Sequence, residues 1–594
     1  MRRRVGLGLL VGLTLNAGCR NSAPPLDAGV PDAGPRAYIE SEPNDRAEQA
    51  LTLEGNASVS AGLGADPSKP DEDWYRLAPP TPRRADLRIS GVPGADVALE
   101  VLDRDRNRMV SVNSASEGQP ERLPHLTVRD PLYVRVYSAR KGAGGAYTLQ
   151  LTWAEEGSGT ELEPNDRAAD SNGLTLAQSI SGTVGHAADE DWYRVELVPG
   201  AADGGAPAAP PVIPEVELPT DGSGEVAVAG GALDGSDGGA APTAEVPSVA
   251  LRLELSAVAG VRSELRVLSA AEAPLFGVKG KEGEPLSLRN VGVRLSDPLV
   301  YVVVRSTWEG TGKNAKRGYN PDVPYSLTVS REEAGTHAEL EPNDERVKAT
   351  PLPLQGFREG FLSPKTDVDH YVLRTDRPTL ARFQLSGVER LDLSLSVLTV
   401  DETGKETVRL RVNEGLVKEP EVLNSVYCER ECWVRVEGSA KKVGTAMVRD
   451  YENTEQPYRL TVASAPDDGS AEREPNNDAA GATALVPGRA QRGTIHPKRD
   501  VDFYRLDLST RQVKTPLLLT LTGILKVDVG LYLHRLGEDG QPELVQTADR
   551  AKGEASEVIR YAADPGVYLL EVRDSKGRES NFQDAYQLTV EETG

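Results

Sequence analysis

The chain contains few of the residues that usually build a catalytic or thiolate centre. Among 594 residues there are 6 His and 3 Cys, and the 6 Phe and 3 Met are also few. Hydrophobic cores must therefore be built from Leu, Val and Ala, with Tyr and a few Trp. After the N-terminal segment, no apolar run reaches the roughly 18 residues that a membrane-spanning helix needs.

Basic residues are also in short supply. There are 67 Lys and Arg against 91 Asp and Glu, which gives a formal net charge of -24. Nucleic-acid binding needs a cationic surface, so this balance argues against a nucleic-acid partner. It suits an exposed protein, or one that gathers cations.

What the chain does have is one acidic motif written four times. The motif is Glu-x-Glu-Pro-Asn, and each copy is followed downstream by Asp-x-Asp and then Tyr. From the second Glu to the first Asp the spacing is identical in the last three copies and three residues longer in the first. The motifs begin at Glu40, Glu161, Glu339 and Glu472, and the Asp pairs are Asp71 and Asp73, Asp189 and Asp191, Asp367 and Asp369, and Asp500 and Asp502. Repetition of this kind predicts one module used four times.

The apolar residues within each copy recur with a period of two. Alternation of apolar and polar residues marks half-buried antiparallel strands, and it occurs at 97–101, 251–255, 391–397 and 527–533. Each copy ends on Tyr-x-Leu-x-(Leu/Val), at 147–151, 325–329, 458–462 and 586–590, preceded by a further strand at 132–136, 300–304, 432–436 and 567–571. Several short strands and no long amphipathic helix predict an all-β chain of four tandem β-sandwiches of the jelly-roll type.

The expected organisation follows from these repeats and from two stretches of biased composition. Residues 20–36 and 199–246 are rich in Pro, Ala, Gly and acidic residues and cannot bury a core. We expect a signal peptide at 1–19, a flexible tether at 20–36, and sandwiches at 37–155, 158–332 (with a disordered insertion at 199–246), 336–466 and 470–594.

The N-terminus resembles a bacterial lipoprotein signal. Arg2, Arg3 and Arg4 precede a short apolar run that ends in small residues before Cys19. The resemblance implies that Cys19 is lipidated, and hence export to the bacterial cell envelope with a lipid anchor in the membrane, expected to be the outer membrane. Asn16 stands where that family usually has Leu, and an ordinary cleaved signal peptide is the alternative.

Cys428 and Cys432 flank a tight loop before an apolar strand. An exported chain meets an oxidising compartment, so the first expectation is a disulfide. A metal pair is the alternative, but two Cys without nearby His or further Cys make a poor zinc site.

The two acidic clusters of each copy suggest a cation site. If the clusters meet, about five carboxylates share one place and repel one another unless a cation neutralises them. Calcium takes six to eight oxygen ligands from carboxylates, amides and carbonyls, and no His or Cys recurs in the pattern to favour zinc or copper. The alternative is turn architecture, because Pro-Asn-Asp is also a good turn former. The Tyr beside each Asp pair is expected to pack in the core.

The ordered motifs resemble the bacterial pre-peptidase C-terminal domain, which is similar to the collagen-binding domains of clostridial collagenases. The resemblance covers most of residues 37–594 outside the insertion, and it implies a non-catalytic jelly-roll sandwich. It also implies one or two Ca²⁺ per repeat, held by the motif and the Asp pair. By position, the implied ligands are Glu40, Glu42, Asn44, Asp45, Asp71 and Asp73; Glu161, Glu163, Asn165, Asp166, Asp189 and Asp191; Glu339, Glu341, Asn343, Asp344, Asp367 and Asp369; and Glu472, Glu474, Asn476, Asn477, Asp500 and Asp502. Asn477 replaces an Asp of the other copies, and no aromatic surface supports collagen binding.

The chain carries no recognisable catalytic motif. His-Glu-x-x-His, Gly-x-Ser-x-Gly and the phosphate-binding Gly-x-x-x-x-Gly-Lys-(Ser/Thr) are all absent from the sequence. We therefore expect no enzyme, and a protein that binds or adheres to an extracellular protein or polysaccharide. A structural spacer and an accessory subunit of a secreted hydrolase are the alternatives.

Overall fold

The structure is a computed structural model, and it describes residues 34–197, 248–294, 297–312, 315–332, 337–401, 403–449, 451–550 and 552–593. Within these ranges the chain is all-β, as predicted. Helical structure is limited to short 3-10 turns such as η1 (Ala47–Gln49), η2 (Ala168–Asp170) and η4 (Arg346–Lys348). None of the helices in the described part of the chain has the length and apolar character needed to cross a membrane.

The region of copy one forms two sheets. Their orders are β1-β3-β10-β5-β8 and β2-β4-β9-β6-β7. The strands are β1 (Arg36–Ile39), β2 (Leu51–Leu53), β3 (Ala57–Leu63), β4 (Glu72–Leu77), β5 (Arg83–Ile89), β6 (Val97–Leu102), β7 (Arg108–Val112), β8 (Glu121–Val128), β9 (Leu132–Ser138) and β10 (Gly145–Ala154). Strand β1 begins at Arg36, inside the segment expected to be tether.

Copy two repeats this arrangement with the orders β12-β21-β14-β17 and β11-β13-β18-β15-β16, and adds the hairpin β19-β20. The strands are β11 (Asn172–Leu174), β12 (Ser179–Gly182), β13 (Glu190–Glu196), β14 (Ser248–Leu255), β15 (Ser263–Ser269), β16 (Pro274–Lys279), β17 (Leu286–Arg294), β18 (Leu299–Ser306), β19 (Trp308–Glu309), β20 (Lys316–Arg317) and β21 (Tyr325–Arg331).

Copy three has the orders β23-β32-β25-β28 and β22-β24-β29-β26-β27, with the hairpin β30-β31. The strands are β22 (Thr350–Leu352), β23 (Gln355–Gly360), β24 (Val368–Arg374), β25 (Thr379–Leu385), β26 (Leu393–Val400), β27 (Glu406–Val412), β28 (Glu421–Cys428), β29 (Glu431–Gly438), β30 (Lys441–Val443), β31 (Ala446–Val448) and β32 (Tyr458–Pro466).

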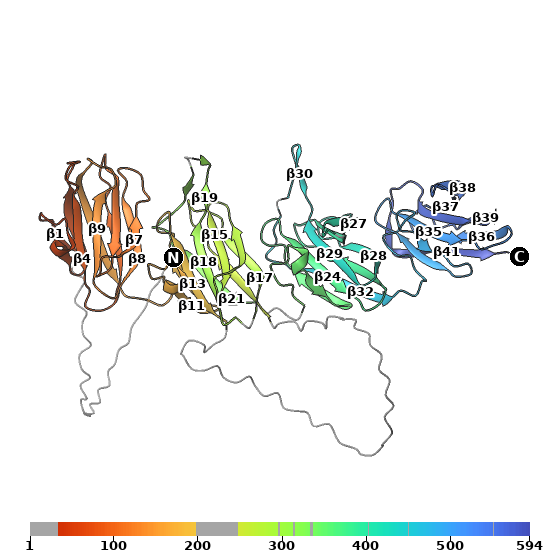
Figure 1. Ribbon diagram of the computed structural model, residues 1–594, viewed down its shortest axis with the longest axis horizontal. Helices are drawn as coiled ribbons and strands as arrows, with labels where there is room; N and C mark the ends of the chain where they lie inside the picture. Colours follow the sequence, from red (N-terminus) through yellow and green to blue (C-terminus); the bar gives the residue numbers. More distant parts are fainter. Residues whose placement is uncertain are drawn as a thin grey trace, which may run out of the picture.

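Copy four has the orders β34-β41-β36-β39 and β33-β35-β40-β37-β38. The strands are β33 (Thr483–Ala484), β34 (Gln491–Ile495), β35 (Val501–Asp507), β36 (Thr515–Leu521), β37 (Val529–Leu536), β38 (Pro542–Ala548), β39 (Glu557–Ala563), β40 (Val567–Asp574) and β41 (Asn581–Glu592). The pairs of sheets follow one another in chain order along the long axis of Figure 1.

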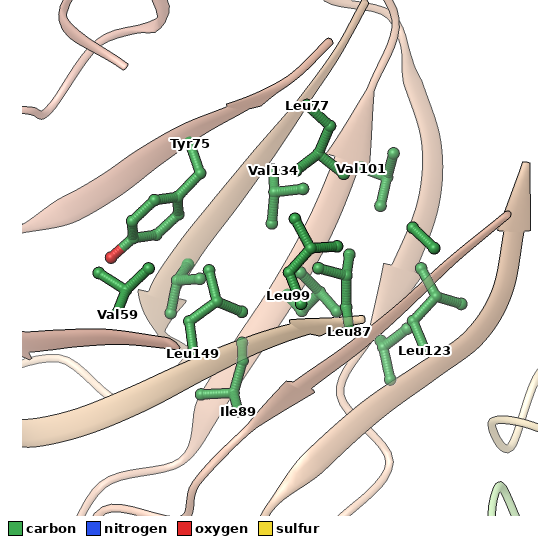
Figure 2. Close-up of a cluster of buried hydrophobic side chains, with 14 of the residues drawn as sticks. Val59, Tyr75, Leu77, Leu87, Ile89, Leu99, Val101, Leu123, Val134 and Leu149 are labelled. Atoms are coloured by element: carbon green, nitrogen blue, oxygen red, sulfur yellow. The ribbon is translucent and has the colours of Figure 1, made fainter. Parts of the chain in front are cut away.

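Each pair of sheets encloses a hydrophobic cluster of its own. Figure 2 shows the cluster of copy one, where Leu77 and Leu99 of one sheet lie among Leu87 and Leu149 of the other. The apolar residues of the alternating strands supply these clusters, because every second side chain of a strand points to the same face.

The predicted half-buried alternation is wrong for β6 and β26. Their outward-facing residues are buried as well, including Glu100 at 5% exposure and Ser394 at 0%. An arginine of a neighbouring strand covers each one: Arg135 forms an ion pair with Glu100, and Arg411 donates to Ser394 Oγ at 3.1 Å. Long side chains from adjacent strands thus bury the outer face of these inner strands.

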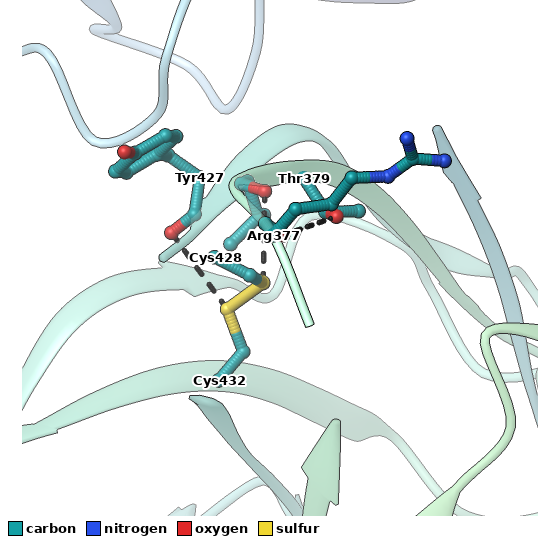
Figure 3. The surroundings of a disulfide bond; sticks show 6 residues. Arg377, Thr379, Tyr427, Cys428 and Cys432 are labelled. Carbon is teal, nitrogen blue, oxygen red and sulfur yellow. Dashed lines mark hydrogen bonds between the residues drawn. A yellow bond between two sulfur atoms is a disulfide. The ribbon is translucent and has the colours of Figure 1, made fainter. Parts of the chain in front are cut away.

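A disulfide joins Cys428 at the end of β28 to Cys432 in β29, with 5.4 Å between the Cα atoms. Figure 3 shows it next to Thr379 and Tyr427. Because β28 and β29 belong to different sheets, the bond ties the two sheets of copy three at one corner. The expected signal segment with Cys19, most of the tether and the insertion at 199–246 lie outside the described residues.

Candidate metal centre

One main-chain hydrogen bond brings the two acidic clusters of each copy together. The Asp pair lies at the start of β4, β13, β24 or β35, and the residue after the second Asp donates its N–H to the carbonyl of the motif Asn. These bonds join Trp74 to Asn44 (3.2 Å), Trp192 to Asn165 (3.1 Å), His370 to Asn343 (3.1 Å) and Phe503 to Asn476 (3.0 Å). The Glu–Pro peptide bond of the motif is cis in all four copies.

In copies one and three, the carboxylates gather into two groups that share the second Glu of the motif. In copy three, oxygen atoms of Glu339, Glu341 and Asp369 lie within 4.8 Å of one another, as do those of Glu341, Asp344 and Asp367. We call these the inner group and the outer group. Inner groups also form from Glu40, Glu42 and Asp73 and from Glu161, Glu163 and Asp191, and an outer group from Glu42, Asp45 and Asp71.

Backbone N–H groups hold two carboxylates of each copy in place. The first Glu of the motif accepts from the N–H of Gly62 (2.8 Å), Thr183 (2.6 Å), Phe361 (2.5 Å) or Thr494 (3.0 Å) in the four copies. The first Asp of the pair accepts from Gly64 (2.5 Å), Gly185 (2.5 Å), Ser363 (2.7 Å) or His496 (2.9 Å). Charge-assisted bonds of this kind fix the geometry of the centre.

Two buried tyrosines complete each inner group. Their hydroxyls bond each other at 2.5–2.6 Å, in the pairs Tyr75–Tyr147, Tyr193–Tyr325, Tyr371–Tyr458 and Tyr504–Tyr586. The later tyrosine also donates to the second Asp, as Tyr147 does to Asp73 at 2.7 Å and Tyr325 to Asp191 at 2.6 Å. The earlier tyrosines lie in the core, as predicted from the sequence, but their hydroxyl contacts were not predicted. The recurrence of two Tyr at fixed places in every copy was the available signal.

A glycine lies where a strand passes the inner group in copies two, three and four, whereas copy one has Ala61 at that position, opposite Tyr147. A Cβ at Gly182 of β12 would lie 2.3 Å from Glu161 Oε2 and 2.5 Å from the Tyr325 hydroxyl. Gly360 and Gly493 meet the same contacts in copies three and four. A side chain at any of these positions would displace the carboxylate.

Several buried oxygen atoms of the centre accept no hydrogen bond. An unsatisfied buried oxygen costs about 1–3 kcal/mol, and more when charged. A cation lying between such oxygens removes that cost, so the donor set fits a metal ion. The atoms are Oδ1 of Asp73, Asp189, Asp191 and Asp369, Oε1 of Glu163 and Glu341, and Oδ1 of Asn44, Asn165 and Asn343.

Copy four brings the motif Asn and its carboxylates together in the same way. With the Asn476 amide in the orientation that satisfies both of its polar atoms, its nitrogen donates to Glu474 Oε1 at 3.2 Å and to Asp502 Oδ1 at 3.0 Å.

Without a cation, these carboxyl groups keep their protons to unusually high pH. Burial raises the pKa of Asp73 to about 9 and that of Glu339 and Asp502 to about 7. Burial, and then the charge of Asp189, raises the pKa of Glu163 well above its usual range. Water is excluded and like charges crowd together, so the ionised form needs compensation by positive charge.

The chemistry of the donors favours a hard cation. Among the described residues, the inner and outer groups offer carboxylate oxygens, with an amide oxygen beside them. Oxygen-only sets suit calcium rather than zinc. In copy two, two His also approach the centre: His125 Nδ1 lies 2.8 Å from Glu161 Oε1, and His186 Nε2 lies 4.0 Å from Asp189 Oδ1. Neither His recurs at the matching position of the other copies.

The centres differ in how far they are open to solvent. In copy one, Glu42 and Asp45 are exposed and Asp71 is half-buried. In copies two to four the second Glu of the motif is 5%, 3% and 3% exposed, at Glu163, Glu341 and Glu474. An open cleft of about 1230 Å³, lined by residues that include Thr127, Glu163 and Asp166, reaches the centre of copy two and gives an ion a path to it.

Comparison with known proteins finds remote similarity to solved structures. No protein-family model and no curated protein matches the chain. Among solved structures, it is similar to the pre-peptidase C-terminal domain of a collagenase from Bacillus anthracis, with 16% identity over 18% of this chain and 94% of that chain and a TM-score of 0.16. It is also similar to the PBSX exported protein XepA, with 13% identity over 40% of this chain and 85% of that chain and a TM-score of 0.15. At these TM-scores the likenesses carry no argument about function.

Proposed function

We propose that this chain is a non-catalytic, exported and lipid-anchored protein of the bacterial cell envelope, built of four tandem jelly-roll sandwiches that each bind one or two Ca²⁺. Its role is to bind or adhere to an extracellular protein or polysaccharide. The N-terminal sequence supports export and anchoring. Four linked sites of modest affinity can gain avidity for a polymer without any single tight site.

The observation that carries the calcium proposal is the convergence of unsatisfied oxygens. Oδ1 of Asp369 and Oε1 of Glu341 are buried and accept no hydrogen bond, and both residues belong to one compact inner group. The same arrangement recurs in the inner group of copy two with Asp191 and Glu163. Turn architecture alone gives no reason for buried oxygens to face one another.

Binding and spacing are separable roles for the array. Hairpins β19-β20 and β30-β31 extend copies two and three and expose Trp308 at 65% and Met447 at 66%. They are the first places to look for ligand contact, since Trp is frequent at binding hot spots.

The spacer alternative is favoured by main-chain hydrogen bonds between successive copies, such as that from Glu341 N–H to the Asn290 carbonyl. A pull-down from native envelopes tests for a hydrolase partner.

Metal removal tests the calcium proposal. We expect the purified chain to bind four to eight Ca²⁺, one or two for each of four copies, and to melt at a lower temperature in chelator. At a calcium concentration of about 100 times Kd, each site adds about 2.7 kcal/mol to the free energy of unfolding. Calorimetry in calcium, magnesium and chelator measures the effect.

The matched control replaces the second Asp of all four pairs by Asn. This fourfold variant (Asp73→Asn, Asp191→Asn, Asp369→Asn and Asp502→Asn) keeps the shape of the inner groups and should lose the response to calcium. An unchanged melting temperature of the natural chain in calcium and in chelator would favour turn architecture instead. Arrays of glycans and matrix proteins, probed in calcium, then distinguish binding from spacing.

A further inference from the structure

In each of copies one, two and three, an edge strand carries a β-bulge. Against its partner strand, β8 has two residues opposite one at Pro124–His125, and β17 and β28 have the same irregularity at Arg289–Asn290 and Asn424–Ser425. The second residue of each bulge has a positive φ: 59° at His125, 52° at Asn290 and 50° at Ser425. Non-glycine residues adopt this conformation rarely, so three repetitions point to a role.

Each bulge binds the motif of the next copy. The N–H of the second Glu donates to the bulge carbonyl, in the pairs Glu163–His125 (2.9 Å), Glu341–Asn290 (2.8 Å) and Glu474–Ser425 (2.9 Å). The carbonyl of the same Glu accepts from the residue two positions further along the edge strand, in the pairs Thr127–Glu163 (2.8 Å), Gly292–Glu341 (2.8 Å) and Tyr427–Glu474 (2.9 Å). In the first joint, His125 Nδ1 also lies 2.8 Å from Glu161 Oε1, inside the next inner group.

The two ends of the array lack one half of this joint. Strand β39 of copy four pairs with β36 in unbroken register, without a bulge, and the described chain has no further copy beyond it. At the other end, the described chain has no copy before copy one, and Glu42 is exposed there. The bulge therefore occurs where a following copy docks, and the second Glu is buried where a preceding copy docks.

We propose that each joint is part of a cation site: the bulged edge strand of one copy completes the calcium centre of the next, so that calcium binding and docking of successive copies strengthen each other. This inference rests on the proposed calcium function. The residue that links the two events is the second Glu. Its main chain forms the joint, and in copy three the carboxylate of Glu341 belongs to both the inner and the outer group.

Docking strengthens calcium binding for two physical reasons. The two main-chain bonds hold Glu341 in place before the ion arrives, which reduces the ordering that binding requires. The preceding copy also keeps water away from Glu341, and a lower local dielectric strengthens the attraction between carboxylate and cation. Because coupling between two binding events is reciprocal, calcium strengthens docking by the same factor.

The test uses the full chain and measures, for each copy separately, how calcium protects the backbone amides of the motif from hydrogen exchange. Hydrogen exchange of peptides that cover the four motifs, measured against calcium concentration, gives one midpoint for each copy. We expect the midpoint of copy one to be about tenfold higher than those of copies two to four. Scattering of the natural chain should also show a narrower range of overall sizes in calcium than in chelator.

A matched pair of proline variants isolates the joint. Gly292→Pro removes the N–H that binds the Glu341 carbonyl. Gly292 lies in β17, which is an edge strand, and edge strands are the place in a sheet where proline is tolerated. Ala562→Pro makes the same change at the equivalent position of β39, opposite Pro516, where the described chain has no further copy to dock. Gly292→Pro should raise the midpoint of copy three about tenfold and leave copy four unchanged, whereas Ala562→Pro should move neither.

The outcomes separate the two proposals. If calcium protects all four motifs with equal midpoints, and Gly292→Pro shifts none of them, the joint inference is overturned while the calcium function stands. If calcium protects no motif, both are overturned. Should Gly292→Pro unfold copy two, Thr127→Pro at the first joint and the scattering of the natural chain give independent answers.

Discussion

Copies one and three present the same motif in two different environments. Glu42 of copy one is exposed, whereas Glu341 of copy three is 3% exposed and hydrogen-bonded to the copy before it. The inner tyrosines and the second Asp are buried alike in both copies. The first Glu differs as well, because Glu40 is half-buried whereas Glu339 is 0% exposed, so the difference covers the motif side of the centre, where the preceding copy docks.

This comparison shows that burial of the centre is a property of the array. A copy alone holds its inner group between its own sheets, but it leaves the second Glu in solvent. A preceding copy covers the second Glu with its bulged edge strand. Backbone groups of that edge are thereby hydrogen-bonded and no longer free to pair with another chain. The second Glu is thus buried in three copies and exposed in one, although the sequence pattern is the same in all four.

The largest expected effect comes from removing the shared carboxylate. In calcium, Glu341→Gln should lower the stability of copy three by about 3 kcal/mol, because it breaks a buried charge pairing. In chelator the loss should disappear, because burial and neighbouring charges raise the pKa of Glu341 well above its usual range and keep its carboxyl protonated, so the neutral amide removes no charge. Glu42→Gln should change copy one by about 1 kcal/mol or less, since its charge is screened by solvent.

Hydrogen exchange of β24 and β4, in calcium and in chelator, measures both variants. Glu429→Gln, at an exposed position in the turn between β28 and β29, is the control for copy three and should have no effect in either condition. Equal losses for Glu341→Gln and Glu42→Gln in calcium would remove the distinction between closed and open centres.

The pH dependence should give the next largest effect. Burial raises the pKa of Glu339 and Asp502 to about 7, above the ordinary values of 4.5 and 3.8. In chelator, this contribution to stability is present at low pH and is lost as pH rises through about 7. Calcium needs the ionised form, so the difference in melting temperature between calcium and chelator should widen from pH 5 to pH 8.

Each proton that calcium displaces makes binding stronger by about 1.4 kcal/mol per pH unit in this window. Calcium titrations by calorimetry in buffers of different ionisation enthalpy count those protons. A binding constant that stays flat between pH 5 and pH 8 would contradict protonated carboxyls in the metal-free chain.

Much of the centre could be predicted from the sequence because its carboxylates recur as a motif. Repetition at a nearly fixed spacing indicated that the two acidic clusters of each copy could meet. The structure brings Glu341 and Asp367 into one outer group. The hydroxyl bonds of Tyr147 and Tyr325 were not predicted, because a buried tyrosine looks the same in the sequence whether its hydroxyl meets a carboxylate or not.

The joints could not be predicted for a different reason. The bulges consist of Pro124–His125, Arg289–Asn290 and Asn424–Ser425, and no residue type is common to all three. What they share is a backbone conformation and two main-chain hydrogen bonds, and main-chain bonds leave little trace in side-chain identity. The buried outer faces of β6 and β26 escaped prediction similarly, because arginines from neighbouring strands cover them.

The smallest expected effect concerns the rim of the outer group, where copy four differs from the others. Asn477 stands in the place of Asp344, and both side chains are exposed. Asn477→Asp adds a negative ligand beside Asp500, so it should raise calcium affinity in copy four by about 0.5 kcal/mol, with Asp344→Asn lowering it equally in copy three. Calcium midpoints from hydrogen exchange of each copy measure both changes, and the double variant should exchange the two midpoints. Shifts above about 1.4 kcal/mol, a factor of ten, would mean that the rim residue binds the ion as strongly as the buried Glu does and that the outer group is less open than its exposure indicates.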